Sequence, residues 1–209
     1  MIRAFLFDIG NVLVRFDFSK AYRAIAPLSS VRDEADVLAR IEAVKLMYED
    51  GQMARAGFLQ QVFEFLQFRG TEAEFIRAWQ GIFTANEPMV ALVRELHARF
   101  PLYLLSNTNC MHVEGLFRDF EWFSLFRGGT YSHLARASKP TPRIYEIACR
   151  EHGLVPAETF FIDDLAANIA TAHALGFHTH HYSPDHHERL LSQLLTEGVD
   201  LLSRGGESE

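Results

Sequence analysis

Phe5-Leu6-Phe7-Asp8-Ile9-Gly10-Asn11-Val12, near the start of this 209-residue chain, is the stretch that decides its fold. The stretch begins inside the apolar run Ala4–Phe7, which is typical of a strand buried on both faces of a parallel sheet. A second run of this kind, Phe160–Ile162, is followed by Asp163 and Asp164. Because open parallel sheets carry their chemistry at the carboxyl ends of the strands, the two segments predict one shared acidic site.

The acidic site is expected to hold a metal ion. Three side chains would converge there, those of Asp8, Asp163 and Asp164. Carboxylates this close repel one another, which raises the pKa of at least one of them unless a cation lies among them. Oxygen ligands of this kind favour a hard divalent ion. We therefore expect Mg²⁺ as the cofactor.

The composition excludes several function classes. The formal net charge is -7 and no long basic run is present, whereas nucleic-acid binding needs clustered Lys and Arg. No apolar run is long enough to span a bilayer, and the apolar N-terminus is interrupted by Asp8, which favours a strand over a signal peptide. Cys110 and Cys149 lie in different predicted helices and form no disulfide framework. We expect a cytoplasmic monomer or homodimer with a small anionic substrate and no nucleic-acid or membrane partner.

The hydrophobic periodicity changes twice along the chain. After the first strand, Phe18–Phe83 contains no strand pattern but several amphipathic stretches, including Glu34–Tyr48 and Gly57–Phe68. Thr71 and Glu74 fit a capping box. Strands and helices then alternate again. The elements predicted in this part are a helix over Met89–Arg99, a strand over Leu102–Leu105, a short strand over Gly129–Tyr131, a helix over Pro142–His152, a strand over Thr159–Ile162, a helix over Leu165–Leu175 and a strand over Phe177–His181.

These patterns predict an α/β fold in which helices flank a Rossmann-like parallel sheet and a small helical insert follows the first strand. The core would comprise residues 1–16 and 85–202, and the insert would comprise residues 17–84. Residues 203–209 are expected to form a disordered tail. The length of the chain fits one core with a modest insertion and hardly fits two full-sized domains.

Four short motifs follow one another along the chain: Asp8, Ser106, Lys139 and the pair Asp163-Asp164. In this order they resemble the motifs of the haloacid dehalogenase-like (HAD) hydrolase superfamily, in its subgroup with a small α-helical cap. The resemblance covers nearly the whole chain, and the ordered set is far more specific than any single motif. It implies that the insert at 17–84 is the small four-helix cap of the family. The segment around Gly10 is similar to that of sugar-phosphate phosphatases acting on glucose 1-phosphate.

The resemblance implies a Mg²⁺-dependent phosphatase that acts on a small phosphorylated metabolite, with sugar phosphates favoured. Asp8 would attack the phosphoryl group and form an aspartyl-phosphate that water then hydrolyses. Ser106 ends a strand and is expected to open a helix, so its hydroxyl and the backbone N–H groups of Asn107 and Thr108 would receive phosphate oxygens. Lys139 would neutralise the phosphate charge.

The resemblance also implies the metal ligands. They are Asp8, the main-chain carbonyl of Gly10, Asp164 as a direct ligand and Asp163 through water. Asn168 follows this pair on a predicted helix, and two interpretations of it remain open. It orients the carboxylates from outside the ligand set, or it is simply a polar residue on a helix face.

Substrate specificity is expected to depend on the cap and on the segment that leaves the first strand. The candidate residues are Asn11, Phe16, Asp17 and Glu49. Asp17 or Glu49 could bind sugar hydroxyls. The sequence is equally compatible with Asp17 as a helix N-cap and with Glu49 as a solvated charge in a turn.

Position 10 departs from the family pattern, because most phosphatases of the family carry a second Asp there that protonates the leaving oxygen. Loss of a positioned acid typically costs about 10²–10⁴-fold in rate. Three interpretations remain open. The chain is an active phosphatase that obtains its proton from the cap, the substrate or water. Alternatively, it is a HAD hydrolase of the dehalogenase or phosphonatase type, or a catalytically degenerate binding or regulatory member.

The second interpretation is disfavoured by the sequence. Dehalogenases of the family do not need the Asp163-Asp164 pair, and phosphonate cleavage needs a cap lysine that forms a Schiff base. The cap offers Lys20 and Lys45, of which Lys45 is predicted to face solvent. Five histidines in the segment 178–187 suggest a transition-metal site, but their placement along a strand and at a helix start favours a structural role.

Overall fold

The computed structural model describes residues 1–31 and 33–201, so the predicted tail at 203–209 lies outside the described residues. Five strands form one parallel sheet in the order β5-β4-β1-β6-β7. These strands are β1 (Ala4–Phe7), β4 (Leu102–Ser106), β5 (Gly128–Tyr131), β6 (Thr159–Asp163) and β7 (His178–His181). The parallel α/β sheet predicted from the buried apolar runs is therefore confirmed.

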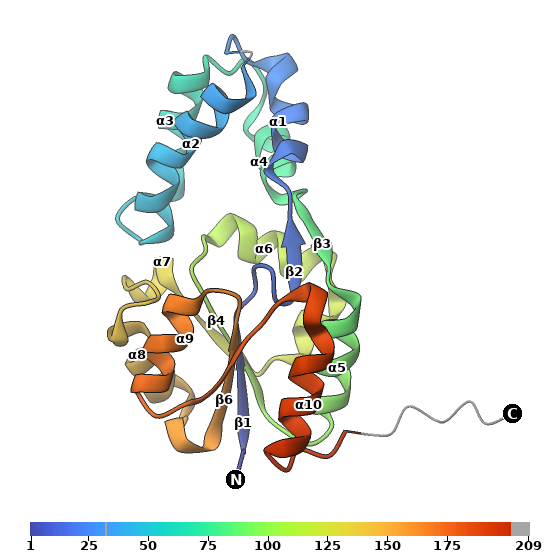
Figure 1. Cartoon of the computed structure of the whole chain (residues 1–209). Helices are drawn as coiled ribbons and strands as arrows, with labels where there is room; N and C mark the ends of the chain where they lie inside the picture. The colour runs from blue at the N-terminus through green and yellow to red at the C-terminus, as the bar shows by residue number, and fades with distance from the viewer. Residues whose placement is uncertain (32, 202–209) are drawn as a thin grey trace, which may run out of the picture.

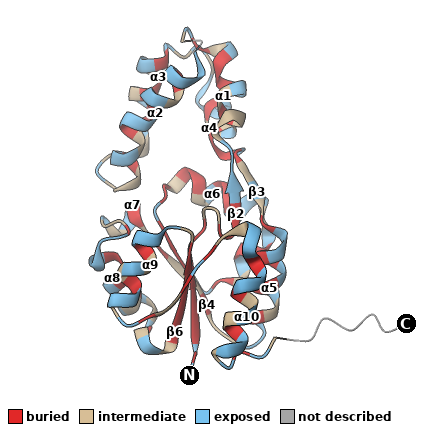
Figure 2. Cartoon of the chain, in the orientation of Figure 1, coloured by how far each residue is buried: buried red, intermediate tan, exposed pale blue. Residues whose placement is uncertain are grey.

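Helices cover both faces of the sheet. Helices α5 (Glu87–His97) and α10 (His187–Thr196) lie on one face, and α8 (Pro142–His152) and α9 (Ala166–Ala174) lie on the other (Figure 1). Alternate side chains of β1 enter the two cores, since Phe5 and Phe7 pack toward α5 and α10 while Ala4 and Leu6 pack toward α8 and α9. The whole of β1 is buried as a result (Figure 2).

Four helices form a separate layer above the sheet (Figure 1). They are α1 (Phe18–Ile25), α2 (Glu34–Glu49), α3 (Arg55–Leu66) and α4 (Glu72–Gln80). Their apolar faces share a core of their own, in which Phe58, Phe75 and Trp79 are fully or almost fully buried. The predicted capping box is present, with Thr71 and Glu74 bonded to each other's backbone N–H. We propose that this helical layer corresponds to the cap predicted at 17–84.

A two-stranded antiparallel ribbon connects this helical layer to the sheet, and the sequence analysis missed it. It consists of β2 (Val14–Phe16) and β3 (Phe83–Ala85), in which Val14 lies opposite Ala85. Strands of three residues are too short to show an alternating pattern, so periodicity could not identify them.

The remaining elements connect these layers. They are α6 (Cys110–Asp119), α7 (Ser132–Ala135) and the 3₁₀-helices η1 (Ala26–Leu28), η2 (Glu121–Leu125), η3 (Pro156–Glu158) and η4 (Pro184–His186). Helix α6 begins four residues after β4 ends, so the expectation that Ser106 opens a helix is wrong. Within the described residues, no helix has both the length and the apolar character that a membrane crossing requires.

Candidate active site

Three carboxylates meet at the carboxyl ends of β1 and β6. Asp8 directly follows β1, and Asp163 is the last residue of β6. The two strands are neighbours, with Phe7 opposite Ile162, so their ends lie side by side. One oxygen from each of Asp8, Asp163 and Asp164 lies within 4.8 Å of the other two. The acidic cluster predicted from the two sequence segments is therefore present and can hold a metal ion.

A buried lysine bridges two of these carboxylates. Nζ of Lys139 lies 2.8 Å from Oδ1 of Asp8 and 2.6 Å from Oδ2 of Asp163. Burial acts to lower the pKa of Lys139, but the two carboxylates outweigh burial and the pKa ends above its usual value. The ammonium group is therefore charged and lies within the acidic cluster.

Burial raises the pKa of two of the acids, Asp8 and Asp164. Desolvation raises the pKa of Asp8 to about 6, although the Lys139 charge opposes the shift. Desolvation also raises the pKa of Asp164, against a hydrogen bond of 3.0 Å from Nδ2 of Asn11 to its Oδ2. The carboxylate form of each is thus destabilised in the protein alone, and a bound cation would reverse this effect.

The third carboxylate has several donors around it. Oδ1 of Asp163 accepts hydrogen bonds from the Leu165 N–H at 2.8 Å and from Nδ2 of Asn168 at 2.9 Å, while Oδ2 faces Lys139. Asn168 is buried and bonded to Asp163, so it is more than a polar residue on a helix face. Its amide orients the Asp163 carboxylate.

The donor set fits a hard divalent cation. Asp8 and Asp164 each keep one oxygen that is not engaged by Lys139 or Asn11, whereas both oxygens of Asp163 are occupied by protein donors. This asymmetry matches direct ligation by Asp8 and Asp164 with Asp163 acting through water. Gly10 lies in the turn after β1, next to this group.

The loop after β4 carries the other predicted phosphate ligands. Ser106 is buried at the end of β4, the strand beside β1. The Thr108 N–H already donates to Oγ of Ser132 at 2.9 Å, so the structure does not support its predicted contact with phosphate. The side chain of Asn107 instead bonds to the backbone of Lys139. Ser106 and the Asn107 backbone remain the candidate phosphate donors of this loop.

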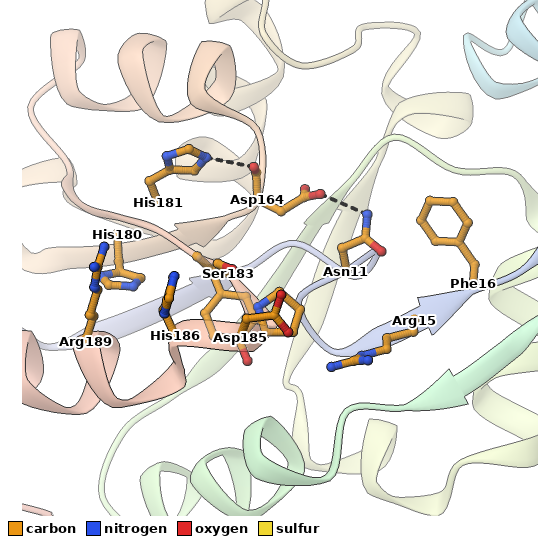
Figure 3. Close-up of a pocket in the computed structure, with 12 residues that line it drawn as sticks. Asn11, Arg15, Phe16, Asp164, His180, His181, Ser183, Asp185, His186 and Arg189 are labelled. Atoms are coloured by element: carbon orange, nitrogen blue, oxygen red, sulfur yellow. Dashed lines mark hydrogen bonds between the residues drawn. The ribbon is translucent and has the colours of Figure 1, made fainter.

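The specificity candidates occupy different surroundings. Asp17 is the N-cap of α1 and accepts a hydrogen bond of 2.9 Å from the Ser19 N–H, which confirms its capping role. Glu49 ends α2 and is half-buried, and burial raises its pKa to about 7. Its Oε1 lies 3.4 Å from Nδ2 of Asn109, so its interpretation as a solvated turn charge is wrong. Phe16 and Asn11 border a cavity beside Asp164 (Figure 3).

The two cap lysines are engaged elsewhere. Nζ of Lys20 donates to Oγ1 of Thr84 at 2.9 Å. Nζ of Lys45 lies 2.8 Å from Oε2 of Glu42 and 5.1 Å above the ring centroid of Phe18. The Lys45 side chain is only 15% exposed, so the prediction that it faces solvent is wrong.

The comparisons with known proteins agree with this geometry. The sequence profile described as haloacid dehalogenase-like hydrolase matches residues 2–176. The chain belongs to the haloacid dehalogenase-like hydrolase family. A relative of this HAD hydrolase, the D-ribitol-5-phosphate phosphatase of Bacteroides thetaiotaomicron, is 27% identical over an alignment of 195 positions, with 86% of this chain and 91% of the relative covered.

Solved structures of the family share the fold of this HAD hydrolase. A HAD family enzyme from Bacteroides thetaiotaomicron, crystallised with magnesium and inorganic phosphate, is 25% identical and has a TM-score of 0.76, with 88% of this chain and 94% of that chain covered. A HAD-like family hydrolase from Porphyromonas gingivalis is 26% identical and has a TM-score of 0.77, with 93% and 98% covered. L-2-haloacid dehalogenase from Xanthobacter autotrophicus, at 20% identity and a TM-score of 0.65 with 96% and 85% covered, shares the fold alone.

The cavity beside Asp164 in this HAD hydrolase contains residues that the sequence analysis did not single out. It measures about 680 Å³. Its wall includes Arg15, Ser183 and Arg189, which come from β2, the loop after β7 and α10 (Figure 3). These residues are far apart in the sequence and belong to no motif, so only the fold brings them together.

Histidines of the segment 178–187 also reach this cavity, and those on β7 have partners of their own. Nδ1 of His180 lies 2.7 Å from Oε1 of Gln193, and Nε2 of His181 lies 2.9 Å from the backbone oxygen of Asp164. Nδ1 of His178 lies 2.9 Å from Oε2 of Glu197. These contacts support the structural role predicted for the β7 histidines.

Proposed function

We propose that this HAD hydrolase is a Mg²⁺-dependent phosphatase that acts on a small phosphorylated metabolite, with sugar phosphates as the favoured class. One observation carries the proposal: a buried lysine lies between Asp8 and Asp163, with Asp164 completing a cluster that can hold a cation. A carboxylate nucleophile can attack a phosphate dianion only where positive charge offsets their repulsion. Lys139 supplies such a charge within hydrogen-bond distance of Asp8.

Each residue of the cluster has a distinct role in the proposed reaction. An oxygen of Asp8 attacks phosphorus, the bond from phosphorus to the leaving oxygen breaks, and water later hydrolyses the aspartyl-phosphate. Lys139 offsets the negative charge of the phosphoryl group, and the Ser106 hydroxyl binds one of its oxygens. Mg²⁺, held by Asp8, Asp164 and the Gly10 carbonyl, would polarise a phosphoryl oxygen as a Lewis acid.

The named relatives support a phosphorylated, polyhydroxylated substrate. The curated relative is a phosphatase named for D-ribitol 5-phosphate, and the solved HAD family enzyme holds magnesium and inorganic phosphate. The dehalogenase that shares the fold supports no carbon–halogen chemistry here, since its identity is 20%. A purely binding role is disfavoured because desolvating Asp8, Lys139 and Asp163 is costly and a binding module has no need of it.

The proposal is tested with a panel of phosphorylated metabolites in Mg²⁺ and in EDTA, using wild type and Asp8→Asn. Sugar phosphates are expected to be hydrolysed in Mg²⁺, and EDTA or Asp8→Asn is expected to abolish the release of phosphate. Hydrolysis that Asp8→Asn leaves unchanged would contradict the mechanism. The cytoplasmic location and the monomeric or homodimeric state remain predictions, which fractionation and light scattering would test.

A further inference from the structure

An aromatic ring fills the space that a side chain at position 10 would occupy. A Cβ atom built on Gly10 would lie 3.1 Å from Cε1 of Phe16 and 3.6 Å from Cδ1. At a carbon contact of 3.1 Å the ring must shift by a few tenths of an ångström, and a longer side chain at position 10 would compete with the ring for the same space. Gly10 and Phe16 therefore form a matched pair in this chain.

The position of the Phe16 ring is held from two directions. The ring makes an edge contact with Phe18, with the centroids 5.7 Å apart. Its backbone lies in the β2–β3 ribbon opposite Phe83. The ring is nevertheless 42% exposed. Its exposed part borders the cavity of about 680 Å³ beside Asn11 and Asp164 (Figure 3).

This cavity gives the non-reacting part of a substrate room next to the carboxylate cluster. The ester group of a phosphate bound at the carboxylate cluster would have this open space beside it. The wall of that space nearest to Gly10 is the Phe16 ring. A phenyl ring offers an apolar surface to a leaving group and has no proton to donate.

The other side chains near the carboxylate cluster already have hydrogen-bond or ion-pair partners within the protein. Lys139 is bonded to both Asp8 and Asp163, and Asp164 accepts from Asn11. His181 lies on the opposite side of Asp164 from Asn11, with its Nε2 bonded to the Asp164 backbone oxygen (Figure 3). Each of these groups is therefore already engaged by a protein partner.

We propose that Phe16 is a specificity-determining residue against which the leaving group lies, so that the preferred substrates are phosphate esters of acidic hydroxyls. Such hydroxyls include those of hemiacetals, enols and carboxylic acids, whose anions depart without protonation by the protein. Phosphate esters of simple primary alcohols are poor substrates for the same reason. D-ribitol 5-phosphate is such an ester, so this chain is expected to differ from the relative named for it in the class of ester that it favours. This inference rests on the proposed phosphatase function and specifies the class of ester that the site accepts.

The proposed step balances without a protein acid. An Asp8 carboxylate oxygen forms a bond to phosphorus, and the bond from phosphorus to the leaving oxygen breaks with its electron pair staying on that oxygen. The released alkoxide or carboxylate takes any proton it needs from water. The hydroxide left by that transfer, or a water molecule, then hydrolyses the aspartyl-phosphate, which regenerates Asp8 and releases inorganic phosphate.

The test is the dependence of kcat/KM on the acidity of the leaving group, because kcat/KM reports the phosphoryl-transfer step. A series of aryl phosphates with graded phenol pKa, together with alkyl phosphates, is assayed in Mg²⁺. Wild type is expected to lose activity steeply as the leaving-group pKa rises. The double variant Gly10→Asp/Phe16→Ala is expected to flatten this slope and to raise activity on alkyl phosphates by about 10²-fold or more.

Single variants separate the effect of position 10 from the effect of position 16. Gly10→Asp alone is expected to lose activity on the whole series, because its side chain meets the ring. Phe16→Ala alone is expected to keep the steep slope but to raise KM more for aryl than for acetyl phosphate. Phe117→Ala is the matched control, since Phe117 on α6 is 43% exposed and does not border the cavity.

The outcomes distinguish this inference from the proposed function. A shallow slope in wild type, or equal activity on aryl and primary alkyl phosphates, overturns the role of Phe16 while leaving a phosphatase. A shallow slope in wild type that becomes steep in His181→Gln would assign the proton to the histidine and would also overturn the role of Phe16. Absence of hydrolysis of every phosphate ester by folded wild type overturns the proposed function itself. The wild-type slope decides the question even if the double variant fails to fold.

Discussion

Asn107 and Lys139 exchange two hydrogen bonds across the active site. Nδ2 of Asn107 donates to the Lys139 carbonyl oxygen at 2.9 Å, and the Lys139 N–H donates to Oδ1 of Asn107 at 2.8 Å. The pair ties the segment that carries the lysine to the loop that follows β4. The ammonium group is therefore aimed between Asp8 and Asp163 by its backbone as well as by its charge.

Substitution of Asn107 is expected to disturb the position of the Lys139 ammonium group between Asp8 and Asp163. Asn107→Ala removes both hydrogen bonds and is expected to lower the free energy of unfolding by about 2 kcal/mol. It is also expected to lower kcat more than it raises KM, because the cation is needed most in the transition state. Asn107→Asp keeps the acceptor and is expected to retain more activity. A change in KM alone would show that Asn107 contacts substrate and does not position Lys139.

Removal of the lysine charge is expected to affect both stability and activity. Lys139→Met leaves two buried carboxylates without their cation, and loss of one partner from a buried ion pair typically costs about 3–5 kcal/mol. Chemical denaturation at neutral pH measures the loss, and phosphatase activity is expected to disappear. Lys45→Met, which removes a cap lysine paired with Glu42, serves as the control and is expected to cost less than about 1 kcal/mol.

Metal binding is expected to stabilise the folded protein independently of any assay of activity. At a Mg²⁺ concentration of about 100 times Kd, the free energy of unfolding is expected to rise by about 2.7 kcal/mol, with a corresponding rise in Tm. Asp164→Asn removes a ligand charge and is expected to abolish most of this rise. An equal Mg²⁺-dependent shift in wild type and Asp164→Asn would place the ion outside the carboxylate cluster.

The stability of the protein is expected to fall in mild acid because of a buried histidine. His112 of α6 stacks on Trp79 of α4, and its Nδ1 lies 3.1 Å from Nδ2 of Asn109. Burial, assisted by the charge of Lys45, lowers the pKa of His112 from 6.5 to about 3. Below pH 6.5 the His112 side chain therefore takes up a proton in the unfolded chain but stays neutral in the folded chain. The contribution of His112 to the free energy of unfolding is present above pH 6.5 and is lost as pH falls.

The His112→Phe variant isolates that contribution while keeping an aromatic ring on Trp79. Between pH 7 and pH 5, wild type is expected to lose about 2 kcal/mol more of its unfolding free energy than the variant loses. Urea denaturation at the two pH values measures the difference. Parallel pH profiles for the two proteins would mean that His112 is protonated in the folded state.

The sequence identified the parts of the site that depend on residue type and order. Asp8 and the Asp163-Asp164 pair end apolar strands, and that pattern alone predicted a shared edge of a parallel sheet. It did not predict that Phe16 would cover Gly10, because that contact depends on how a three-residue strand bends back over the first turn. The burial of Glu49 was missed for a similar reason, since it arises from the core loop that meets the end of α2.

Hydrophobic periodicity also could not predict which side chains bond to each other across the site. Asn107 was expected to serve phosphate through its backbone, and its side chain instead bonds to Lys139, 32 positions away in the chain. The orientation of Asp163 by Asn168 was one of two open interpretations until burial distinguished them. Contacts of this kind follow from tertiary packing and leave no regular signal in a single sequence.

The pairing of Val14 with Ala85 means that the chain leaves the sheet and returns to it at adjacent points. The helices between these points form an inserted segment that begins and ends at the same place on the sheet. The length of this segment does not alter the register of β1 against β4 and β6. Such an inserted segment can be lengthened, shortened or exchanged during evolution while the carboxylates and the lysine stay in place. The architecture thus allows the choice of metabolite to diverge separately from the chemistry performed on it.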